Sequence, residues 1–304
     1  MSRATLSFLL SALIAGLAQP ASAATRRLAV LVGNNAGSGD RPSLRWAETD
    51  AAKLARVLVE VGEVDSEDVA LRLGGSVADL EGALAQVKER LAVARRTSDA
   101  RLLLYFYFSG HSDGESLELG RERYPIARLK ARLAEVGADV RLTILDACRS
   151  GAAIASKGGS KAPPFEIRMA DSLVSTGEVL LASSAADELA LESPEVRGSY
   201  FTHFFVSGIR GAADSSGDGL ITLQEAYRFA YDRTVAASSA TLQPPQHPTY
   251  DFRLSGQGEL VLAALTARTA GLVLPPGFER ALVLDLARDQ VVAEIPVGAS
   301  PRVA

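Results

Sequence analysis

The stretch Leu102-Leu103-Leu104-Tyr105-Phe106-Tyr107-Phe108-Ser109-Gly110-His111 decides how this chain of 304 residues folds. Its uninterrupted apolar run predicts a strand over Leu102–Phe108 that is buried on both faces, which is typical of a parallel sheet. The polar residues that follow mark the end of the strand. His111, one of three histidines in the chain, therefore comes just past the carboxyl end of a buried strand.

A second apolar run has the same arrangement. Leu142–Leu145 is followed by Asp146-Ala147-Cys148-Arg149-Ser150-Gly151, and Cys148 is the only cysteine of the chain. Open α/β sheets carry their chemistry at the carboxyl ends of the strands, where neighbouring strand ends meet. We therefore expect the Cys148 thiol and the His111 imidazole to lie close together.

Strand and helix patterns alternate along the rest of the main domain. Strands are predicted over Leu28–Val32, Val69–Leu73, Leu102–Phe108, Val140–Leu145 and Val179–Ala182. Apolar residues at helical spacing predict helices over Glu48–Val61, Val77–Val93, Pro125–Glu135, Phe201–Ile209 and Leu223–Ala236. This alternation predicts an α/β fold with a doubly wound, mostly parallel sheet that is flanked by helices.

Residues 1–23 have the layout of a secretory signal peptide. Arg3 lies near the start, Leu6–Leu17 is an apolar run, and Ala21-Ser22-Ala23 fits a cleavage site. The apolar run is short for a membrane span, and a retained N-terminal anchor is the alternative. The sequence predicts a periplasmic or secreted protein, with no membrane span after removal of the signal.

Two domains are expected after the signal peptide: a main domain over residues 24–258 and a small β-rich segment over residues 259–304. Short β-like runs without helical spacing indicate the second: Gly271-Leu272-Val273-Leu274, Arg280–Leu286 and Val291–Ile295. About three strands are fewer than an independent sheet prefers, so we expect this segment to be incomplete, and to pack on the main domain or be tethered to it. Between Gly151 and Gly177, a polar stretch predicts a long exposed loop directly after the cysteine.

Composition argues against a nucleic-acid partner and shows a single cysteine, Cys148, whose role needs an explanation. The formal net charge of −4 gives no basic field, so nucleic acid is not an expected partner. Cys148 has no second cysteine with which to form an internal disulfide. A small buried hydrophobe is the alternative role for a free cysteine, but the polar neighbours Asp146, Arg149 and Ser150 count against it.

A thiol and an imidazole at neighbouring strand ends can form a nucleophile and its base. The imidazole accepts the thiol proton, and the thiolate attacks a carbonyl carbon. The main-chain N–H groups of Cys148 and Ser112 are candidates for the oxyanion hole that stabilises the resulting negative charge. Two unrelated polar residues at strand ends are the alternative reading of the same pattern.

These two motifs together resemble the caspase/metacaspase superfamily of cysteine peptidases, most closely its bacterial metacaspase-like members. The resemblance covers about residues 27–255 and includes Leu28-Ala29-Val30-Leu31-Val32-Gly33-Asn34-Asn35. It implies a caspase-like fold, with His111 as general base and Cys148 as nucleophile in the hydrolysis of peptide bonds through a thioester. It also implies that Ser112 and Cys148 supply the oxyanion hole, although Ser112 replaces the usual Gly.

The resemblance further implies a pocket for arginine or lysine. Asp146 stands where metacaspases have a pocket acid, and Ser109 precedes the Gly-His pair. The segment Leu44-Arg45-Trp46-Ala47-Glu48-Thr49-Asp50 points to Asp50 as a second acid, although Trp46 and Thr49 depart from the family pattern. Carboxylates in a narrow pocket hold a guanidinium bidentately. An exposed acid in the first turn of a helix is the alternative role for Asp50.

The stretch from Asp214 to Glu225 has the spacing of an EF-hand calcium loop. Its candidate Ca²⁺ ligands are Asp214, Ser216, Asp218, the Leu220 carbonyl, Thr222 and Glu225. A turn with a helix N-cap at Thr222 is the alternative. The loop has fewer acids than the strongest calcium loops, so any binding is expected to be weak, and the chemistry itself needs no cofactor.

We therefore expect an exported cysteine endopeptidase that acts on proteins or peptides after Arg or Lys. The alternative is a non-catalytic caspase-like binding module, in which the calcium loop and the C-terminal segment are the working parts. The retained Cys148 and His111 favour the peptidase.

Overall fold

The computed structural model describes residues 24–39, 41–150, 152, 176–255, 259–265, 277 and 279–296. Its centre is a sheet of six strands in the order β11-β7-β6-β3-β1-β2. The strands are β1 (Thr25–Gly33), β2 (Val69–Leu73), β3 (Arg101–Ser109), β6 (Val140–Asp146), β7 (Thr176–Ala182) and β11 (Thr249–Ser255). All neighbours pair in parallel except β11, which runs antiparallel to β7 at the edge.

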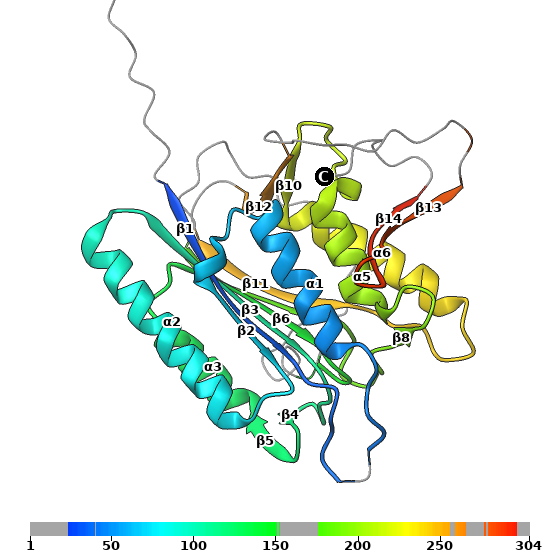
Figure 1. Cartoon of the computed structure of the whole chain (residues 1–304), viewed down its shortest axis with the longest axis horizontal. Helices are drawn as coiled ribbons and strands as arrows, with labels where there is room; N and C mark the ends of the chain where they lie inside the picture. The colour runs from blue at the N-terminus through cyan, green and yellow to red at the C-terminus, as the bar shows by residue number, and fades with distance from the viewer. Residues whose placement is uncertain are drawn as a thin grey trace, which may run out of the picture.

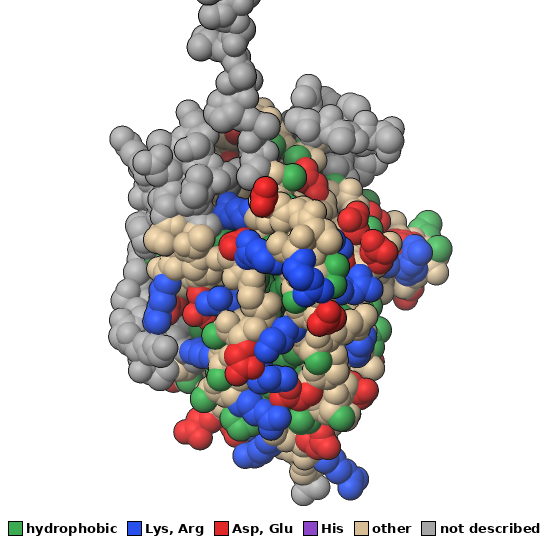
Figure 2. Space-filling model, turned by 90° about the vertical axis from the view of Figure 1, so that its left-hand side faces the viewer, with side chains coloured by type: hydrophobic (Ala, Val, Ile, Leu, Met, Phe, Trp, Pro, Cys, Tyr) green, Lys and Arg blue, Asp and Glu red, His purple; other side chains and the backbone are tan. Residues whose placement is uncertain are grey.

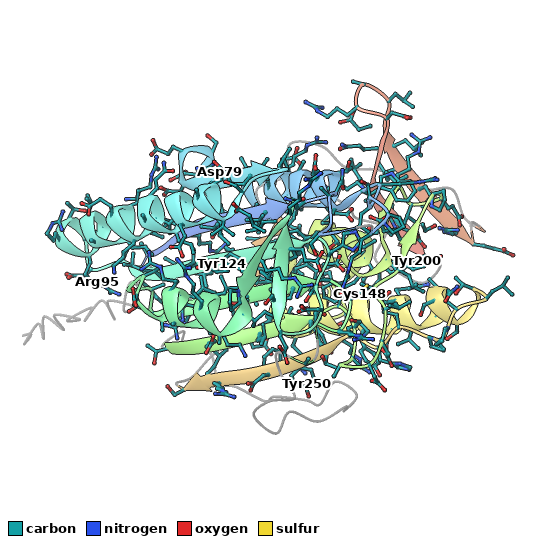
Figure 3. All side chains as sticks on the ribbon, turned by 90° about the horizontal axis from the view of Figure 1, so that it is seen from below. Asp79, Arg95, Tyr124, Cys148, Tyr200 and Tyr250 are labelled. Atoms are coloured by element: carbon teal, nitrogen blue, oxygen red, sulfur yellow. The ribbon has the colours of Figure 1, made fainter. Side chains whose placement is uncertain are left out.

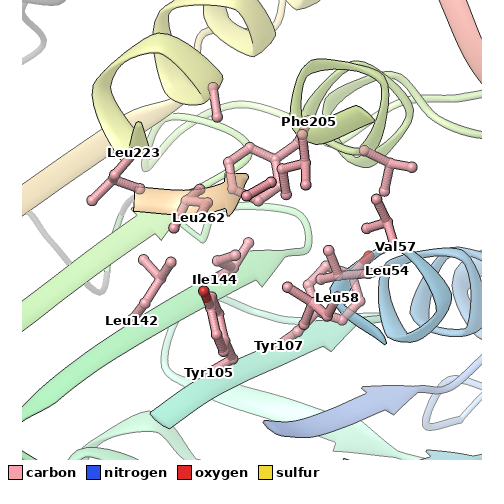
Figure 4. Close-up of a cluster of buried hydrophobic side chains, with 14 of the residues drawn as sticks. Leu54, Val57, Leu58, Tyr105, Tyr107, Leu142, Ile144, Phe205, Leu223 and Leu262 are labelled. Carbon is pink, nitrogen blue, oxygen red and sulfur yellow. The ribbon is translucent and has the colours of Figure 1, made fainter. Parts of the chain in front are cut away.

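Helices cover both faces of this sheet (Figure 1). The first face carries α1 (Ala47–Glu60), α5 (Tyr200–Ser207) and α6 (Leu223–Ser239), and the second carries α2 (Val77–Thr97) and α3 (Ile126–Ala134). Successive residues of a strand point to opposite faces. In β3, Tyr105 and Tyr107 therefore enter the core under α1 and α5, while Phe106 and Phe108 enter the core under α2 and α3. Figure 4 shows the first of these cores. The predicted fold class is confirmed.

The face on the α2 side carries basic and acidic side chains interspersed (Figure 2). Many of them form ion pairs across elements. Arg90 of α2 lies 2.9 Å from Asp68 in the short helix η1 (Ser66–Asp68), and Arg128 of α3 lies 2.7 Å from Glu81 of α2. Positive charge on this face is therefore balanced locally.

The structure adds strands that the sequence analysis did not predict. A hairpin of β4 (Ser116–Leu119) and β5 (Glu122–Pro125) follows His111. Its second strand is mostly charged and exposed, so no apolar alternation announces it. The edge strand β11 had a readable signal, because Tyr250, Phe252 and Leu254 alternate with polar residues and pack on the core.

Several shorter elements complete the fold. They are β8 (Glu192–Ser193), β9 (Gly198–Ser199), the π-helical turn η2 (Gly208–Ala212) after α5, β10 (Leu220–Thr222) and β12 (Val261–Ala264). β12 follows residue 258 but pairs with β10, and Leu262 is fully buried in the main core. The start of the expected C-terminal segment thus packs on the main domain.

The last two strands, β13 (Arg280–Asp285) and β14 (Gln290–Pro296), form an antiparallel hairpin. The β-like runs predicted over Arg280–Leu286 and Val291–Ile295 are confirmed. The predicted run Gly271–Leu274, the predicted signal peptide and most of the predicted loop after Cys148 lie outside the described residues. Within the described part of the chain, none of the helices has the length and apolar character needed to cross a bilayer.

Candidate functional site

The paired ends of β3 and β6 bring His111 and Cys148 to one place. Ser109 is the register partner of Asp146, and the Gly110 N–H donates to the Asp146 carbonyl at 3.2 Å. His111 and Cys148 each come two residues after this pair, and both line one pocket (Figure 3 labels Cys148). The pocket holds about 300 Å³ of space, part of it open to solvent. Its lining residues are Leu44, Ser109, Gly110, His111, Asp146, Cys148, Ala190, Glu192 and Ser199.

A backbone carbonyl orients the imidazole of His111. Nε2 lies 3.0 Å from the carbonyl oxygen of Pro42. Because a carbonyl oxygen can only accept, Nε2 carries the ring proton and Nδ1 of the neutral ring has a free lone pair. Gly37 packs on the ring so closely that a Cβ there would lie 2.6 Å from His111 Cδ2. The ring therefore has a set tautomer and little room to move.

The segment that carries Pro42 is tied to the end of β1 through Asn35. Asn35 Oδ1 accepts from the Glu48 N–H, and the Asn35 N–H donates to Glu48 Oε1, each at 3.2 Å. This exchange caps the start of α1, where Trp46 at the N-cap makes no side-chain bond. Asn34 donates through Nδ2 to the Gly75 carbonyl at 2.9 Å. Asn35 thus holds the segment before α1, which carries the Pro42 carbonyl.

Cys148 lies in a tight turn after β6. The next residue, Arg149, has a left-handed backbone (φ 56°), and its N–H donates to the Glu188 carbonyl at 2.9 Å. Burial raises the pKa of the Cys148 thiol, and Sγ contacts the Ala190 carbonyl at 4.0 Å. Among the described residues no direct hydrogen bond joins this thiol to His111. The resting thiol is therefore neutral and partly shielded from solvent.

The two N–H groups predicted for the oxyanion hole have no partner in the described part of the chain. Ser112 pairs with Leu117 across the β4 edge, but the flanking bonds run from Glu118 N to His111 O and from Asp113 N to Ser116 O. The hairpin thus leaves the Ser112 N–H unused. Ser112 is buried next to the pocket and is not part of its lining, so its role stays a prediction.

Asp146 is the acid of the pocket. Its side chain is buried, and Oδ2 accepts from the hydroxyls of Ser199 and Thr202, the latter at 2.5 Å. The other oxygen, Oδ1, has no hydrogen-bond partner in the described structure. Burial raises the pKa of Asp146, and the surrounding hydroxyl groups of Ser199, Thr202 and Ser183 oppose this rise. A buried carboxylate oxygen without a partner favours a donor brought by a ligand.

Asp50 lies behind this pocket rather than in its lining. Its side chain is fully buried, its Oδ2 accepts from the Ser199 N–H at 2.8 Å, and its Oδ1 lies 3.6 Å from Lys53 Nζ. Burial raises the pKa of Asp50 and lowers that of Lys53, and each charge opposes the shift of the other. The structure thus brings Asp50 to the backbone of Ser199, and its predicted contact with substrate stays a prediction.

Two lining residues were given no role by the sequence. Glu192 accepts from the N–H groups of Arg45 and Trp46, each at 3.0 Å, and so joins the pocket rim to the segment before α1. Ser199 caps α5 by accepting from the Thr202 N–H at 3.0 Å, while its own hydroxyl donates to Asp146. A serine before a helix pattern is an N-cap signal that could have found Ser199. No pattern in the sequence around Glu192 indicates its place in the pocket lining.

The candidate calcium loop uses its carboxylates on its own backbone. Glu225 Oε2 accepts from the Thr222 N–H at 3.1 Å in a capping box, and Glu225 Oε1 accepts from the Ser215 N–H. Asp214 accepts from the Gly217 and Gly219 N–H groups. Among the described residues no three His, Cys, Asp or Glu side chains converge to hold a metal ion. Calcium binding by this loop stays a sequence-based prediction.

Comparison with known proteins identifies the family and the fold. A model of the caspase domain matches residues 26–255. The chain belongs to the caspase-domain family. The crystal structure of caspase-1 from Spodoptera frugiperda matches this caspase-domain protein with a TM-score of 0.50 and 14% identity, over 81% of this chain and 93% of that one. No curated protein matches the chain. Family membership supports cysteine peptidase chemistry on protein substrates, and the structural likeness supports the fold.

Proposed function

We propose that this caspase-domain protein is a cysteine endopeptidase with His111 and Cys148 as its catalytic dyad. One observation carries the proposal: both side chains line one pocket at neighbouring strand ends, and the Pro42 carbonyl leaves His111 Nδ1 free to accept a proton. Because the resting thiol is neutral, the proton leaves Cys148 as attack begins, with His111 as the general base.

The reaction proceeds in two stages, formation of the thioester and its hydrolysis. The Cys148 thiol proton passes to His111, the sulfur bonds to the substrate carbonyl carbon, and the negative charge on oxygen faces the N–H groups of Cys148 and Ser112. The C–N bond then breaks, and the leaving amine takes the proton from His111. Water loses a proton to His111 and attacks the thioester, which releases the acid and returns the proton to sulfur.

The proposed specificity is for Arg or Lys before the cleaved bond. Asp146 supports it, because a buried carboxylate oxygen without a partner rewards a cationic donor and penalises a neutral or acidic side chain. Ser109, Glu192 and Ser199 line the same pocket and add polar groups to its wall. An aspartyl substrate would bring a second negative charge close to Asp146, which opposes binding.

Export is the proposed localisation, and its support is the signal-peptide layout of residues 1–23. The predicted cleavage leaves Ala24 as the first residue. Mass spectrometry of the protein from a cell's exported fraction tests this directly, since a retained leader on that protein would contradict cleavage.

The decisive experiment measures turnover of arginyl and aspartyl fluorogenic peptides by the wild type, two variants and one matched control. Cys148→Ala is expected to abolish turnover of the arginyl peptide, and His111→Ala to lower kcat/KM by about 10³-fold. His247→Ala is the control, because His247 is partly exposed and pairs with Glu188 outside the pocket lining. Turnover that survives Cys148→Ala would rule out the thiol mechanism.

The same preparation separates the peptidase from a non-catalytic binding module. An arginyl chloromethyl ketone is expected to add one covalent group, and peptide mapping should place it at Cys148. A folded protein that takes up no label and turns over no peptide would favour the binding module.

A further inference from the structure

The C-terminal hairpin packs on the helix that starts beside the pocket. β14 lies against α5, as Figure 1 shows, and its buried Ala293 and Ile295 pack with Ala281 and Val283 of β13. The Glu294 N–H donates to Ser207 Oγ of α5 at 2.9 Å. This hydrogen bond from the β14 backbone ties the hairpin to α5 of the main domain.

A buried carboxylate anchors this contact. Glu294 is 5% exposed, and its Oε2 lies 3.0 Å from His203 Nε2 of α5. Arg280 of β13 donates to both oxygens of Glu294, at 3.0 and 3.1 Å. A buried carboxylate is tolerated only when charged or polar donors satisfy it. Loss of either His203 or Arg280 would therefore leave Glu294 buried without one of its donors.

The same hairpin reaches the loop between β8 and β9. Arg280 Nη1 lies 2.6 Å from Glu195 Oε1, so one guanidinium joins the anchor Glu294 to the loop. Arg197 of the loop pairs with the carboxylate of Asp289 and donates to the Asp289 carbonyl at 2.8 Å. Two contacts thus hold the outer side of residues 193–199.

The inner side of this loop is held by the buried pair behind the pocket. Lys53 Nζ donates to the Arg197 carbonyl at 2.6 Å, and Asp50 accepts from the Ser199 N–H. A Cβ on Gly198 would lie only 2.4 Å from Asp50 Oδ1, so the backbone runs directly over this carboxylate. The loop ends at Ser199, whose hydroxyl donates to Asp146. A short path of contacts therefore leads from the hairpin to the pocket acid.

We propose that the β13–β14 hairpin is a positioning element of the substrate pocket, and that Arg280 and Asp289 set, through residues 193–199, how tightly a basic side chain is held at Asp146. Arg280 is the stronger of the two, because its loss also removes a partner of the buried Glu294. The Asp289 pair is mostly exposed, and such pairs contribute little. The proposal rests on the proposed function for its substrate and extends it to residues outside the pocket.

The test uses the full chain with Arg280→Met, with Arg288→Met as the matched control. Arg288 lies on the same hairpin and pairs with Asp285 of its own turn. Arg280→Met is expected to raise KM for the arginyl peptide by roughly fivefold and to leave kcat within about twofold. Arg280→Lys should recover part of this loss. The rate at which iodoacetamide alkylates Cys148 should stay unchanged in all three variants.

A second readout needs no peptidase activity. Hydrogen exchange of the peptides that cover residues 192–205 should be faster in Arg280→Met than in wild type or Arg288→Met. If Arg280→Met does not fold, Glu195→Ala breaks the same link from the loop and should give the same two changes. Unchanged exchange and unchanged KM would overturn the positioning role. If exchange is faster in Arg280→Met but the wild type turns over no peptide, the proposed function is overturned and the positioning role is kept.

Discussion

The strand ends that carry His111 and Cys148 and the loop that borders them are held in different ways. The strand ends are set by backbone hydrogen bonds of a parallel sheet, in which Ser109 and Asp146 are direct partners. The loop over residues 193–199 is held by side chains from α1, β6 and the C-terminal hairpin, through Lys53, Asp50 and Arg280 among others.

This difference teaches where reactivity and selectivity are encoded. The reacting groups follow from residues that are neighbours in the sequence, because a strand places whatever comes after it. The shape of the pocket follows from side chains that are far apart in the sequence, such as Lys53 and Arg280, each of which contributes a small part. Changes at the strand ends should therefore alter kcat, and changes around the loop should alter KM and stability.

Asp146 lies where the two regions meet, so its substitution should have the largest effect on activity among the changes that follow. Asp146→Asn keeps an acceptor for the hydroxyls of Ser199 and Thr202 and removes the charge. The loss of a charge-assisted hydrogen bond costs about 2–3 kcal/mol. We therefore expect kcat/KM for an arginyl peptide to fall about 30- to 150-fold, with little change for a neutral peptide.

Asp50→Asn is the matched comparison on the other side of Ser199. It leaves Lys53 buried without its charged partner, which destabilises a protein by about 3 kcal/mol or more. Urea unfolding should show this loss, while the preference for arginine over a neutral residue persists. An equal loss of arginine preference in both variants would mean that Asp50 contacts the substrate directly.

The sequence predicted the region that local pattern controls. Apolar runs announced β3 and β6, and the polar residues directly after them supplied His111 and Cys148. The role of the Pro42 carbonyl in orienting His111 could not be predicted, because a backbone acceptor leaves no signature in the sequence. The contacts of Glu192 and Glu294 were equally hidden, since each depends on partners that only the folded chain brings near. The edge strand β11 was missed although its alternation was readable.

Gly37→Ala should disturb the strand-end region alone. The new Cβ would lie 2.6 Å from His111 Cδ2, so the ring must shift away from the Pro42 carbonyl. Misplacement of a base by part of an ångström is expected to lower kcat about tenfold and to leave KM unchanged. Gly82→Ala in α2 is the control, because a Cβ there meets nothing within 4 Å. An unchanged kcat in Gly37→Ala would show that the ring position is not critical.

The smallest expected effect concerns the hairpin and pH. Burial lowers the pKa of His203 below its ordinary 6.5, and the donors His203 and Arg280 lower the pKa of Glu294 despite its burial. In both cases the unfolded chain binds more protons than the folded one, so stability falls as pH drops below 6.5 through His203, and falls further below 4.5 through Glu294. A loss of about 1 kcal/mol corresponds to a Tm that is about 2–4 °C lower.

Thermal melts at about pH 7.5 and about pH 5.5 check this, with His203→Gln as the comparison. Glutamine can still donate to Glu294 but does not titrate, so its Tm should change less with pH. Identical changes in the two proteins would assign the pH dependence to other groups.

The buried thiol of Cys148 has a consequence for chemical survival. Peroxides and disulfides attack the thiolate far faster than the protonated thiol, and burial keeps this sulfur protonated at neutral pH. A lone cysteine with a raised pKa is therefore oxidised slowly. It becomes reactive only when an acceptor for its proton and an electrophile are present together.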